Sequence, residues 1–233
     1  MNFSDRHVVV TGGTGALGIA VVTALIDLGA ICNVPWHTET EAENFPHRGH
    51  RQVVLVGNTN LTEEAGVARL FDGVDKLWAS IHLAGGFAMS PVAKTDKAAL
   101  MHQIEMNLVT TFLCCRAAVN RMTGNRDGGR IVNVAARPAL EWRSGAGMAA
   151  YTASKAGVAA LTAALAEEVV KDGILVNAVA PSIMDTMANR DAMPKADTAL
   201  WPKVDEVAKT ILFLASSDNR VTRGSIVPVY GKS

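Results

Sequence analysis

Short runs of apolar, mostly β-branched residues alternate along this chain with longer segments in which apolar residues recur at helical spacing. The short runs predict strands over 7–11, 30–34, 52–56, 77–84, 130–135, 174–180 and 225–229. The longer segments predict helices over 16–28, 61–71, 100–122, 151–171 and 205–215. This alternation is typical of an α/β protein, with a doubly wound parallel sheet covered by helices on both faces. No linker, repeat or low-complexity segment divides the chain, so we expect one domain over residues 1–233.

Composition supports a packed globule and argues against several classes of function. Hydrophobic residues make up 49% of the chain and charged residues 19%, and 22 basic side chains balance 22 acidic ones. This balance leaves no basic patch for nucleic acid or an anionic membrane surface. Glycines and an aspartate interrupt the apolar run over 7–28, which therefore predicts neither a signal peptide nor a membrane span. Three cysteines and six scattered histidines show no disulfide or metal-ligand spacing, so we expect a cytoplasmic protein without a metal site.

The segment from Gly145 to Gly157 carries the main candidate chemistry. Tyr151 is expected to open a helix, and Lys155 then lies one turn later on the same face. An isolated phenol has a pKa of about 10, and a neighbouring ammonium group lowers this pKa by stabilising the phenolate. The pair predicts a general acid and base that works near neutral pH. A tyrosine and a lysine that merely share a helix surface would show the same short pattern.

Glycines dominate the predicted turn between the first strand and the first helix. From Thr11 to Gly18 the sequence reads T-G-G-T-G-A-L-G, with glycines at positions 12, 15 and 18 among them. Glycines let a backbone turn sharply and approach a pyrophosphate, and a helix N-terminus supplies free N–H groups and the positive end of its dipole. A strand, glycine turn and helix in this order indicate a Rossmann-type dinucleotide site. The alternative is a tight turn without a ligand.

The second strand lacks the carboxylate that usually holds the adenosine ribose of a bound dinucleotide. His37 follows the strand, and Glu39 and Glu41 come later than the expected position. The missing carboxylate removes repulsion against a 2′-phosphate, and His37 or Arg48 would partly neutralise one. The sequence therefore slightly favours NADP over NAD.

With both motifs in one chain of this length, the sequence resembles the short-chain dehydrogenase/reductase family nearly from end to end. Further likenesses are Asn60-Leu61, Ala84-Gly85, Asn107-Leu108 and the stretch from Pro181 to Thr186, where Ser182 replaces a glycine of the family pattern. The resemblance implies a dinucleotide-binding oxidoreductase domain with seven parallel strands in the order 3-2-1-4-5-6-7. The apolar helix faces over 100–119 and 158–169 resemble the family's dimer helices, so an even-numbered homo-oligomer is expected.

The resemblance also assigns roles to individual residues. Tyr151 would exchange a proton with a small-molecule substrate, and Lys155 would hold the nicotinamide ribose and lower the tyrosine pKa. Asn107 would maintain a water path to Lys155. The implied cofactor, NADP or NAD, would contact Gly12, Thr14, Gly15, Leu17, Gly18, His37, Asn60, Leu61, Ala84, Gly85, Tyr151, Lys155, Pro181, Ile183 and Thr186.

One departure from the family pattern bears on the substrate. The family places a serine after the fifth strand to hydrogen-bond the substrate carbonyl, and here Ala136 takes that position. Loss of one such donor commonly costs about a hundred- to a thousandfold in rate. The candidate replacement donors are Arg137, Ser144 and Thr152. A substrate that carries its own polarisation would suffer less from the loss.

Within the family, the dihydropteridine reductases also lack this serine, and they reduce a quinonoid pterin. Three stretches resemble them, namely 84–87, 145–151 and 185–197 together with Trp201. Two hypotheses follow. The first is an NAD(P)-dependent oxidoreductase that acts on a carbonyl or quinonoid, pterin-like substrate. The second is a nucleotide-binding sensor or scaffold whose catalysis is impaired by the alanine.

Overall fold

In a computed structural model that describes residues 1–233, seven parallel strands form one sheet in the order β3-β2-β1-β4-β5-β6-β7. The strands are β1 (His7–Thr11), β2 (Ile31–Pro35), β3 (Val53–Val56), β4 (Leu77–His82), β5 (Gly129–Val134), β6 (Ile174–Pro181) and β7 (Ile226–Val229). The predicted strand order is confirmed. Because β1 pairs with both β2 and β4, the winding of the sheet reverses beside β1. Open α/β sheets bind their ligands at such a point, beyond the carboxyl ends of the strands.

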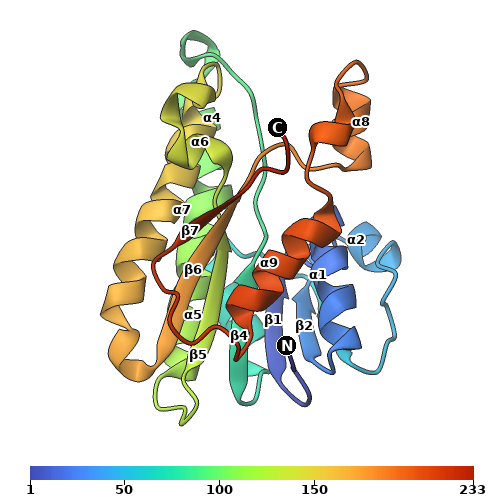
Figure 1. Cartoon of the computed structure of the whole chain (residues 1–233), viewed down its shortest axis with the longest axis vertical. Helices are drawn as coiled ribbons and strands as arrows, with labels where there is room; N and C mark the ends of the chain where they lie inside the picture. The colour runs from blue at the N-terminus through green and yellow to red at the C-terminus, as the bar shows by residue number, and fades with distance from the viewer.

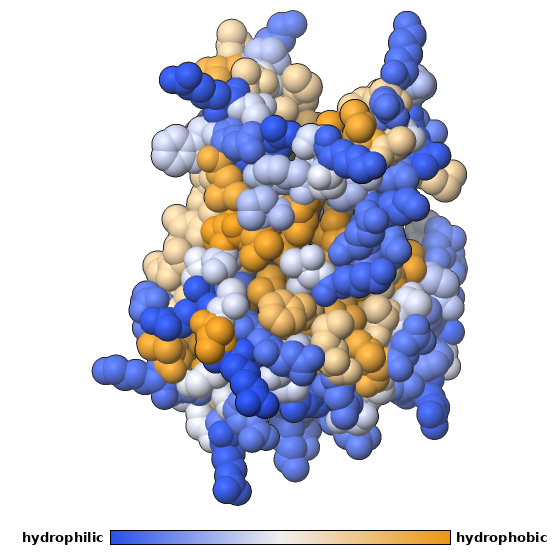
Figure 2. Space-filling view, viewed as in Figure 1, coloured by the Kyte–Doolittle hydropathy of each residue, from blue (hydrophilic) through white to orange (hydrophobic).

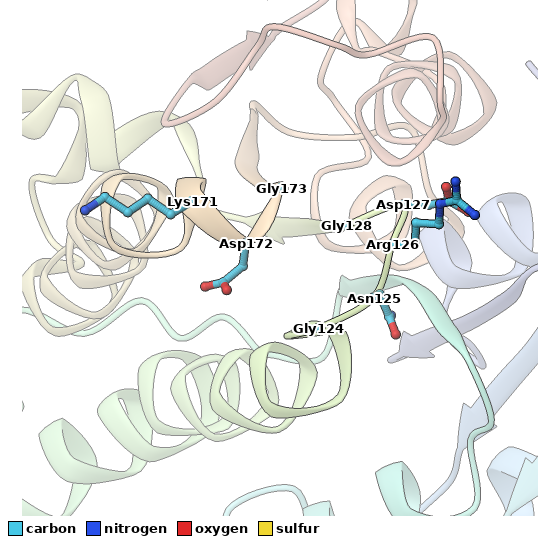
Figure 3. A pocket seen from close by; sticks show the side chains of 8 residues that line it. All are labelled: Gly124, Asn125, Arg126, Asp127, Gly128, Lys171, Asp172 and Gly173. Carbon is cyan, nitrogen blue, oxygen red and sulfur yellow. The ribbon is translucent and has the colours of Figure 1, made fainter.

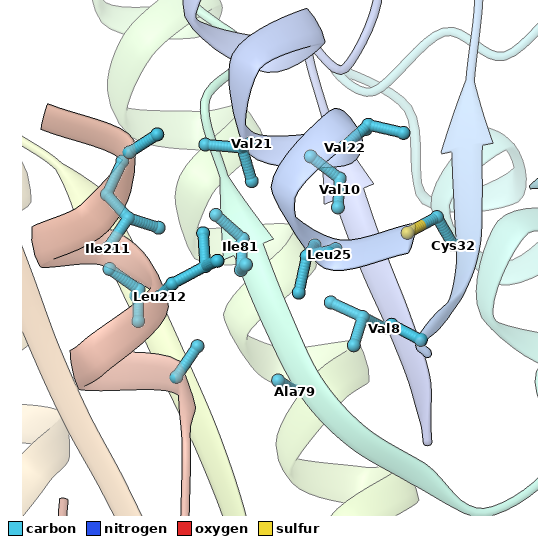
Figure 4. Packing of buried hydrophobic residues seen from close by; sticks show 14 of the residues in the cluster. Val8, Val10, Val21, Val22, Leu25, Cys32, Ala79, Ile81, Ile211 and Leu212 are labelled. Atoms are coloured by element: carbon cyan, nitrogen blue, oxygen red, sulfur yellow. The ribbon is translucent and has the colours of Figure 1, made fainter. Parts of the chain in front are cut away.

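Helices cover both faces of this sheet (Figure 1). They are α1 (Ala16–Asp27), α2 (Glu39–Glu43), α3 (Glu64–Asp72), α4 (Lys97–Ile104), α5 (Thr110–Met122), α6 (Arg137–Leu140), α7 (Ala149–Glu168), α8 (Met187–Ala192) and α9 (Val204–Ala215). On one face, Leu25 of α1 and Ile211 of α9 pack over Val8 and Ile81 of the central strands (Figure 4). On the other face, α3, α5 and α7 pack around Val9. The side chains of alternate β1 residues therefore pack into two separate hydrophobic cores, as expected of a strand buried on both sides.

The predicted helix over 100–122 is a composite of three pieces. A π-helical turn over Glu105–Val109 joins α4 to α5, and Asn107 lies in the middle of this turn. Such turns widen a helix locally and are frequent at functional sites. The predicted helix over 61–71 begins only at Glu64, because the backbone N–H of Thr62 donates to Oδ1 of Asn60 and holds a turn there.

The sequence pattern did not predict α2, α6 or α8. Each has only four to six residues, which is too few to show helical periodicity. No helix of the chain combines the length and the apolar character needed to cross a bilayer.

Candidate active site

The turn between β1 and α1 has the backbone that a dinucleotide pyrophosphate requires. Gly12 has a φ of 66°, and a Cβ on it would lie 2.7 Å from the backbone nitrogen of Ala84. A side chain at Gly18 would collide with the backbone of Gly12, so the turn and the helix approach closely. Gly15 is the N-cap of α1, and no side chain caps the first N–H groups of the helix. These N–H groups and the positive end of the helix dipole are therefore available to an anion.

A cavity of about 300 Å³ lies beside this turn, at the carboxyl ends of the strands. Of the predicted site residues, those that line it are Gly12, Gly15, Leu17, Gly18, Gly85, Tyr151, Lys155, Pro181 and Thr186. The glycine backbone, the uncapped helix and the adjacent lysine fit a nicotinamide dinucleotide.

Tyr151 and Lys155 lie in the first two turns of α7, one turn apart, and both line the cavity. Nζ of Lys155 is directed into the protein and donates to the carbonyl oxygen of Val134 at the end of β5, at 2.8 Å. The ring of Phe87 stands edge-on to the ring of Tyr151, with centroids 5.0 Å apart. This edge-to-face packing orients the phenol from its apolar side.

The other hydroxyl groups that line the cavity already have partners. Oγ of Ser182 donates to the carbonyl oxygen of Tyr230, and Oγ1 of Thr186 accepts from the backbone of α8. The hydroxyl of Tyr151 is therefore the lining hydroxyl without a hydrogen-bond partner in the protein, and the hydroxyl of Thr186 also keeps its own proton.

The environment of this pair shifts both pKa values toward the neutral forms. Burial raises the pKa of Tyr151 to about 12 and lowers the pKa of Lys155 to about 8. The prediction that Lys155 lowers the tyrosine pKa is therefore wrong for this structure. Loss of solvent dominates, and the lysine is engaged by the carbonyl of Val134. Tyr151 is a protonated phenol at neutral pH, which suits proton donation.

Asn107 is fully buried, and its side-chain amide both accepts and donates hydrogen bonds. Its Oδ1 accepts from the N–H of Gly86 at 3.1 Å, and its Nδ2 lies 3.1 Å from the carbonyl oxygen of the same residue. Nδ2 also lies 3.2 Å from Oγ of Ser154, a residue that the sequence analysis did not single out. A Cβ on Gly85 would meet both Asn107 and Lys155, so only a glycine fits between them. The structure thus brings the predicted asparagine beside the predicted lysine.

The position expected for the family serine is apolar. Ala135 and Ala136 line the cavity and are 1% and 5% exposed. The predicted replacement donors do not line it: Arg137 and Ser144 both donate to Glu141, and the buried hydroxyl of Thr152 has no partner.

Some predicted cofactor residues lie outside the cavity lining, namely Thr14, His37, Asn60, Leu61, Ala84 and Ile183. The N–H of Ala84 donates to Oγ1 of Thr11, and this hydrogen bond joins the loop after β4 to the start of the glycine turn. Asn60 holds the turn before α3, and Leu61 packs against the core beneath it. His37 is exposed at the end of β2.

The structure places at this strand end a carboxylate that the sequence analysis set aside. Oε2 of Glu41 accepts from the backbone N–H groups of His37 at 2.7 Å and Thr38 at 3.3 Å. A capping box between Thr38 and Glu41 at the start of α2 folds the carboxylate back. The pattern Thr-x-x-Glu was the signal that could have revealed it.

A second hollow lies at the opposite end of the sheet, before β5 and β6 (Figure 3). Its residues come from two loops, Gly124–Gly128 and Lys171–Gly173, and none of them is hydrophobic. Both signs of charge occur in it, and it contains no predicted site residue. The chain has no group of three or more histidine, cysteine or acidic residues placed to hold a metal ion.

Comparisons with known proteins agree with this geometry. The chain is 30% identical to subunit BbsD of (2S)-[(R)-hydroxy(phenyl)methyl]succinyl-CoA dehydrogenase from Thauera aromatica, over 99% of this chain and 97% of that protein. It is 34% identical to galactitol 2-dehydrogenase from Rhizobium johnstonii, over 96% of this chain and 93% of that protein. The solved structure of ElxO with NADP bound has a TM-score of 0.88 at 23% identity, and covers 97% of this chain and 98% of its own.

The family model described as short chain dehydrogenase matches residues 6–197. Together with the full-length relatives, this match shows the class of the enzyme. The chain belongs to the short-chain dehydrogenase/reductase family and is an NAD(P)-dependent oxidoreductase.

Proposed function

We propose that this protein reduces a small substrate that carries its own polarised acceptor, such as a quinonoid, pterin-like ring or an activated carbonyl, with Tyr151 as the proton donor. One observation carries the proposal. The Tyr151 hydroxyl has no partner in the protein and lies in the cavity one turn from Lys155, and the position of the family's second donor is occupied by Ala136. An unactivated ketone would lack one of its two hydrogen bonds in this cavity. A substrate whose acceptor atom is already polarised by conjugation needs the proton from Tyr151 but not the second hydrogen bond.

The residues of the chain have separable tasks in this mechanism. When bound, a reduced nicotinamide would supply the hydride. Gly12, Gly15 and the first N–H groups of α1 would hold the phosphates. Tyr151 would transfer its proton to the substrate oxygen or nitrogen, since burial keeps its hydroxyl protonated and raises its pKa to about 12. Lys155 would hold the ribose from its position on the carbonyl of Val134.

The surroundings of the cavity support a planar, largely apolar substrate. Phe87 lines the cavity and is 61% exposed, and Met89, Trp142 and Met187 are between 66% and 81% exposed on the segments that follow β4, β5 and β6. Exposed aromatic and methionine side chains around a cleft favour apolar rings. In Figure 2 the upper part of the molecule is notched between two lobes, and hydrophobic side chains gather below the notch.

The test is the variant Tyr151→Phe, assayed with NADH and NADPH on ketones, activated carbonyls and quinonoid dihydropterin. We expect turnover at least about a hundredfold lower, because a general acid contributes roughly 10²- to 10⁴-fold. Cofactor affinity, measured by tryptophan quenching, is expected to change little. Unchanged turnover would remove Tyr151 from the mechanism. If the wild-type protein bound cofactor but turned over no panel member, the sensor or scaffold hypothesis would replace the enzyme.

We also propose an even-numbered homo-oligomer in the cytoplasm. Leu100 and Met101 of α4 and Phe112 of α5 are 39%, 40% and 49% exposed on helices that resemble the family's dimer helices. Sedimentation of the purified protein tests this: a monomer at micromolar concentration would contradict it.

A further inference from the structure

We propose that the segment Tyr230–Ser233 ties together two walls of the active-site mouth, and that Ser182 is the positioning residue that anchors this tie. The inference rests on the proposed function of the cavity that Ser182 lines. In Figure 1 the end of the chain, marked C, lies between α6 and α8.

The first anchor is Ser182, which follows the last residue of β6. Its Oγ donates to the carbonyl oxygen of Tyr230 at 3.0 Å and lies 2.7 Å from Oγ of Ser233. Oγ of Ser233 also donates to that carbonyl, at 2.8 Å. The two hydroxyl groups carry two protons for these three contacts, so at any moment two of the contacts are hydrogen bonds, and together they hold the carbonyl of Tyr230 beside the cavity. A glycine at position 182 would leave no side chain to form these contacts.

The second anchor is the base of the loop that carries α8. The N–H of Asp185 donates to the carbonyl oxygen of Pro202 at 2.9 Å, so the loop 185–202 is closed at its base. The N–H of Lys232 donates to the carbonyl oxygen of Leu200, also at 2.9 Å. Gly231 has a φ of 65°, and a Cβ on it would lie 2.8 Å from the nitrogen of Pro202. The tie therefore packs backbone against backbone on this loop.

The third anchor is α6, on the opposite wall. The guanidinium carbon of Arg137 lies 5.0 Å from the centre of the Tyr230 ring, within the range of a cation–π contact. Nε of Arg137 donates to Oε2 of Glu141 at 2.8 Å, which orients the guanidinium group. Arg137 directly follows Ala136, a residue of the cavity wall.

These three anchors connect the walls that a substrate must pass between. One wall is the loop 185–202, and the other is the segment 137–145. Because Ser182 and Ala136 line the cavity themselves, we expect movement of the tie to change the width of the mouth, whereas the position of Tyr151 is set by α7. The role is thus one of positioning, with a larger effect on KM than on kcat.

Hydrogen exchange of the full chain, without substrate, tests the tie independently of activity. In Ser182→Ala we expect amide exchange over 183–202 to become about 3- to 10-fold faster, as for the loss of one or two neutral hydrogen bonds. In Tyr230→Leu we expect faster exchange over 137–145 and little change over 183–202, since its carbonyl remains. Ser182→Thr keeps a hydroxyl and is expected to restore slow exchange. Ser4→Ala, which removes a hydroxyl hydrogen-bonded to Asn2 near the start of β1, is the matched control.

Steady-state kinetics supply the second readout once a substrate is known. Ser182→Ala is expected to raise KM about 3- to 10-fold while kcat changes less than twofold. Exchange rates unchanged from wild type in both Ser182→Ala and Tyr230→Leu would overturn the proposal. If exchange changes as expected but no panel substrate is turned over, the tie stands and the proposed function fails.

Discussion

The side-chain amide of Asn107 pairs with the backbone of Gly86 through two hydrogen bonds, each 3.1 Å long. The pair joins the π-helical turn to the loop after β4. The next residue of that loop is Phe87, whose ring stands against Tyr151. Asn107 therefore holds the loop that orients the phenol, in addition to any water that it contacts.

Asn107→Asp tests this relationship because it changes one atom. An oxygen would replace the nitrogen that faces the carbonyl of Gly86 and the hydroxyl of Ser154. A buried carboxylate facing acceptors is strongly unfavourable. We expect kcat/KM to fall at least about tenfold and the melting temperature to fall by several degrees, because the variant loses neutral hydrogen bonds and leaves a buried carboxylate facing acceptors. Asn125→Asp, which removes a hydrogen bond to Leu77 far from the site, is the control. Equal kcat/KM in both variants would contradict the role.

Much of the fold and the centre of the site could be predicted from sequence because they depend on local patterns. Alternating apolar runs indicated the seven strands, and the glycines at 12, 15 and 18 indicated the turn. The one-turn spacing of Tyr151 and Lys155 placed both in one cavity.

The remainder depends on contacts between distant residues or on burial. The hydrogen bond from Ser182 to Tyr230 joins residues 48 positions apart, so no local sequence pattern predicts it. The π-helical turn at Asn107 keeps an ordinary helical composition, so periodicity predicted one continuous helix. The pKa shift of Tyr151 has the opposite sign to that predicted, because the degree of burial is not readable from the Tyr-x-x-x-Lys spacing.

Ala136→Ser is expected to broaden the substrate range. The residue lines the cavity and is the N-cap of α6, where no side chain now caps the helix. A serine would offer a second donor to a ketone, so we expect turnover of simple ketones to rise about 10- to 100-fold. Turnover of quinonoid substrates should change less than threefold. Ala139→Ser, on the same helix and outside the cavity lining, is the control. If turnover of ketones and of quinonoid substrates rose equally, the missing hydroxyl at position 136 would not be what sets the substrate preference.

Glu41→Gln is expected to shift cofactor preference toward NADPH. The carboxylate is held at the end of β2 by the N–H groups of His37 and Thr38, near the place where a ribose 2′-substituent is expected. Removing its charge relieves repulsion against a 2′-phosphate and keeps a hydrogen-bond acceptor. We expect the ratio of the NADH and NADPH dissociation constants to move at least about fivefold toward NADPH, a coupling of about 1 kcal/mol. Glu43→Gln, exposed on the same short helix, should leave the ratio unchanged.

His82 lies in a buried chain of hydrogen bonds beneath the site. Its Nδ1 lies 2.8 Å from Oδ1 of Asn133, and its Nε2 lies 2.7 Å from Oγ of Ser80. Nδ2 of Asn133 donates to Oγ1 of Thr162 on α7. Because the oxygen of Asn133 only accepts, Nδ1 carries a proton. Burial lowers the pKa of His82 to about 4, so the imidazole is neutral at pH 7 and its Nε2 accepts from Ser80.

Acid should therefore weaken the fold through His82. Burial lowers the pKa of His82 from 6.5 to about 4, so the unfolded state binds more protons between these two values. The histidine contributes no penalty above pH 6.5, and stability is lost as the pH falls from 6.5 to 4, by on the order of 2 to 3 kcal/mol. Urea unfolding at pH 7 and pH 4.5 measures this loss. His82→Asn should reduce the pH dependence, whereas the exposed variant His102→Asn should keep it. An identical slope in all three proteins would contradict the assignment.

The variant Lys155→Met tests whether the lysine is needed for cofactor binding and turnover although its buried charge lowers the free energy of unfolding. Burial lowers the pKa of Lys155 from 10.5 to about 8, so below pH 8 the folded protein carries a buried ammonium that the unfolded chain keeps in water. This penalty is fully present below pH 8 and is relieved as the pH rises toward 10.5, because the unfolded state binds more protons in that window.

Methionine at position 155 fills a similar volume without charge, and it leaves the carbonyl of Val134 without the hydrogen bond from Lys155. We expect the variant to be about 1 to 2 kcal/mol more stable than wild type at pH 7, the charge penalty being partly offset by the lost hydrogen bond. The advantage should shrink between pH 8 and pH 10, while cofactor binding and turnover fall at every pH. A variant less stable than wild type at pH 7, with a constant difference up to pH 10, would show that the ammonium is not strained by burial.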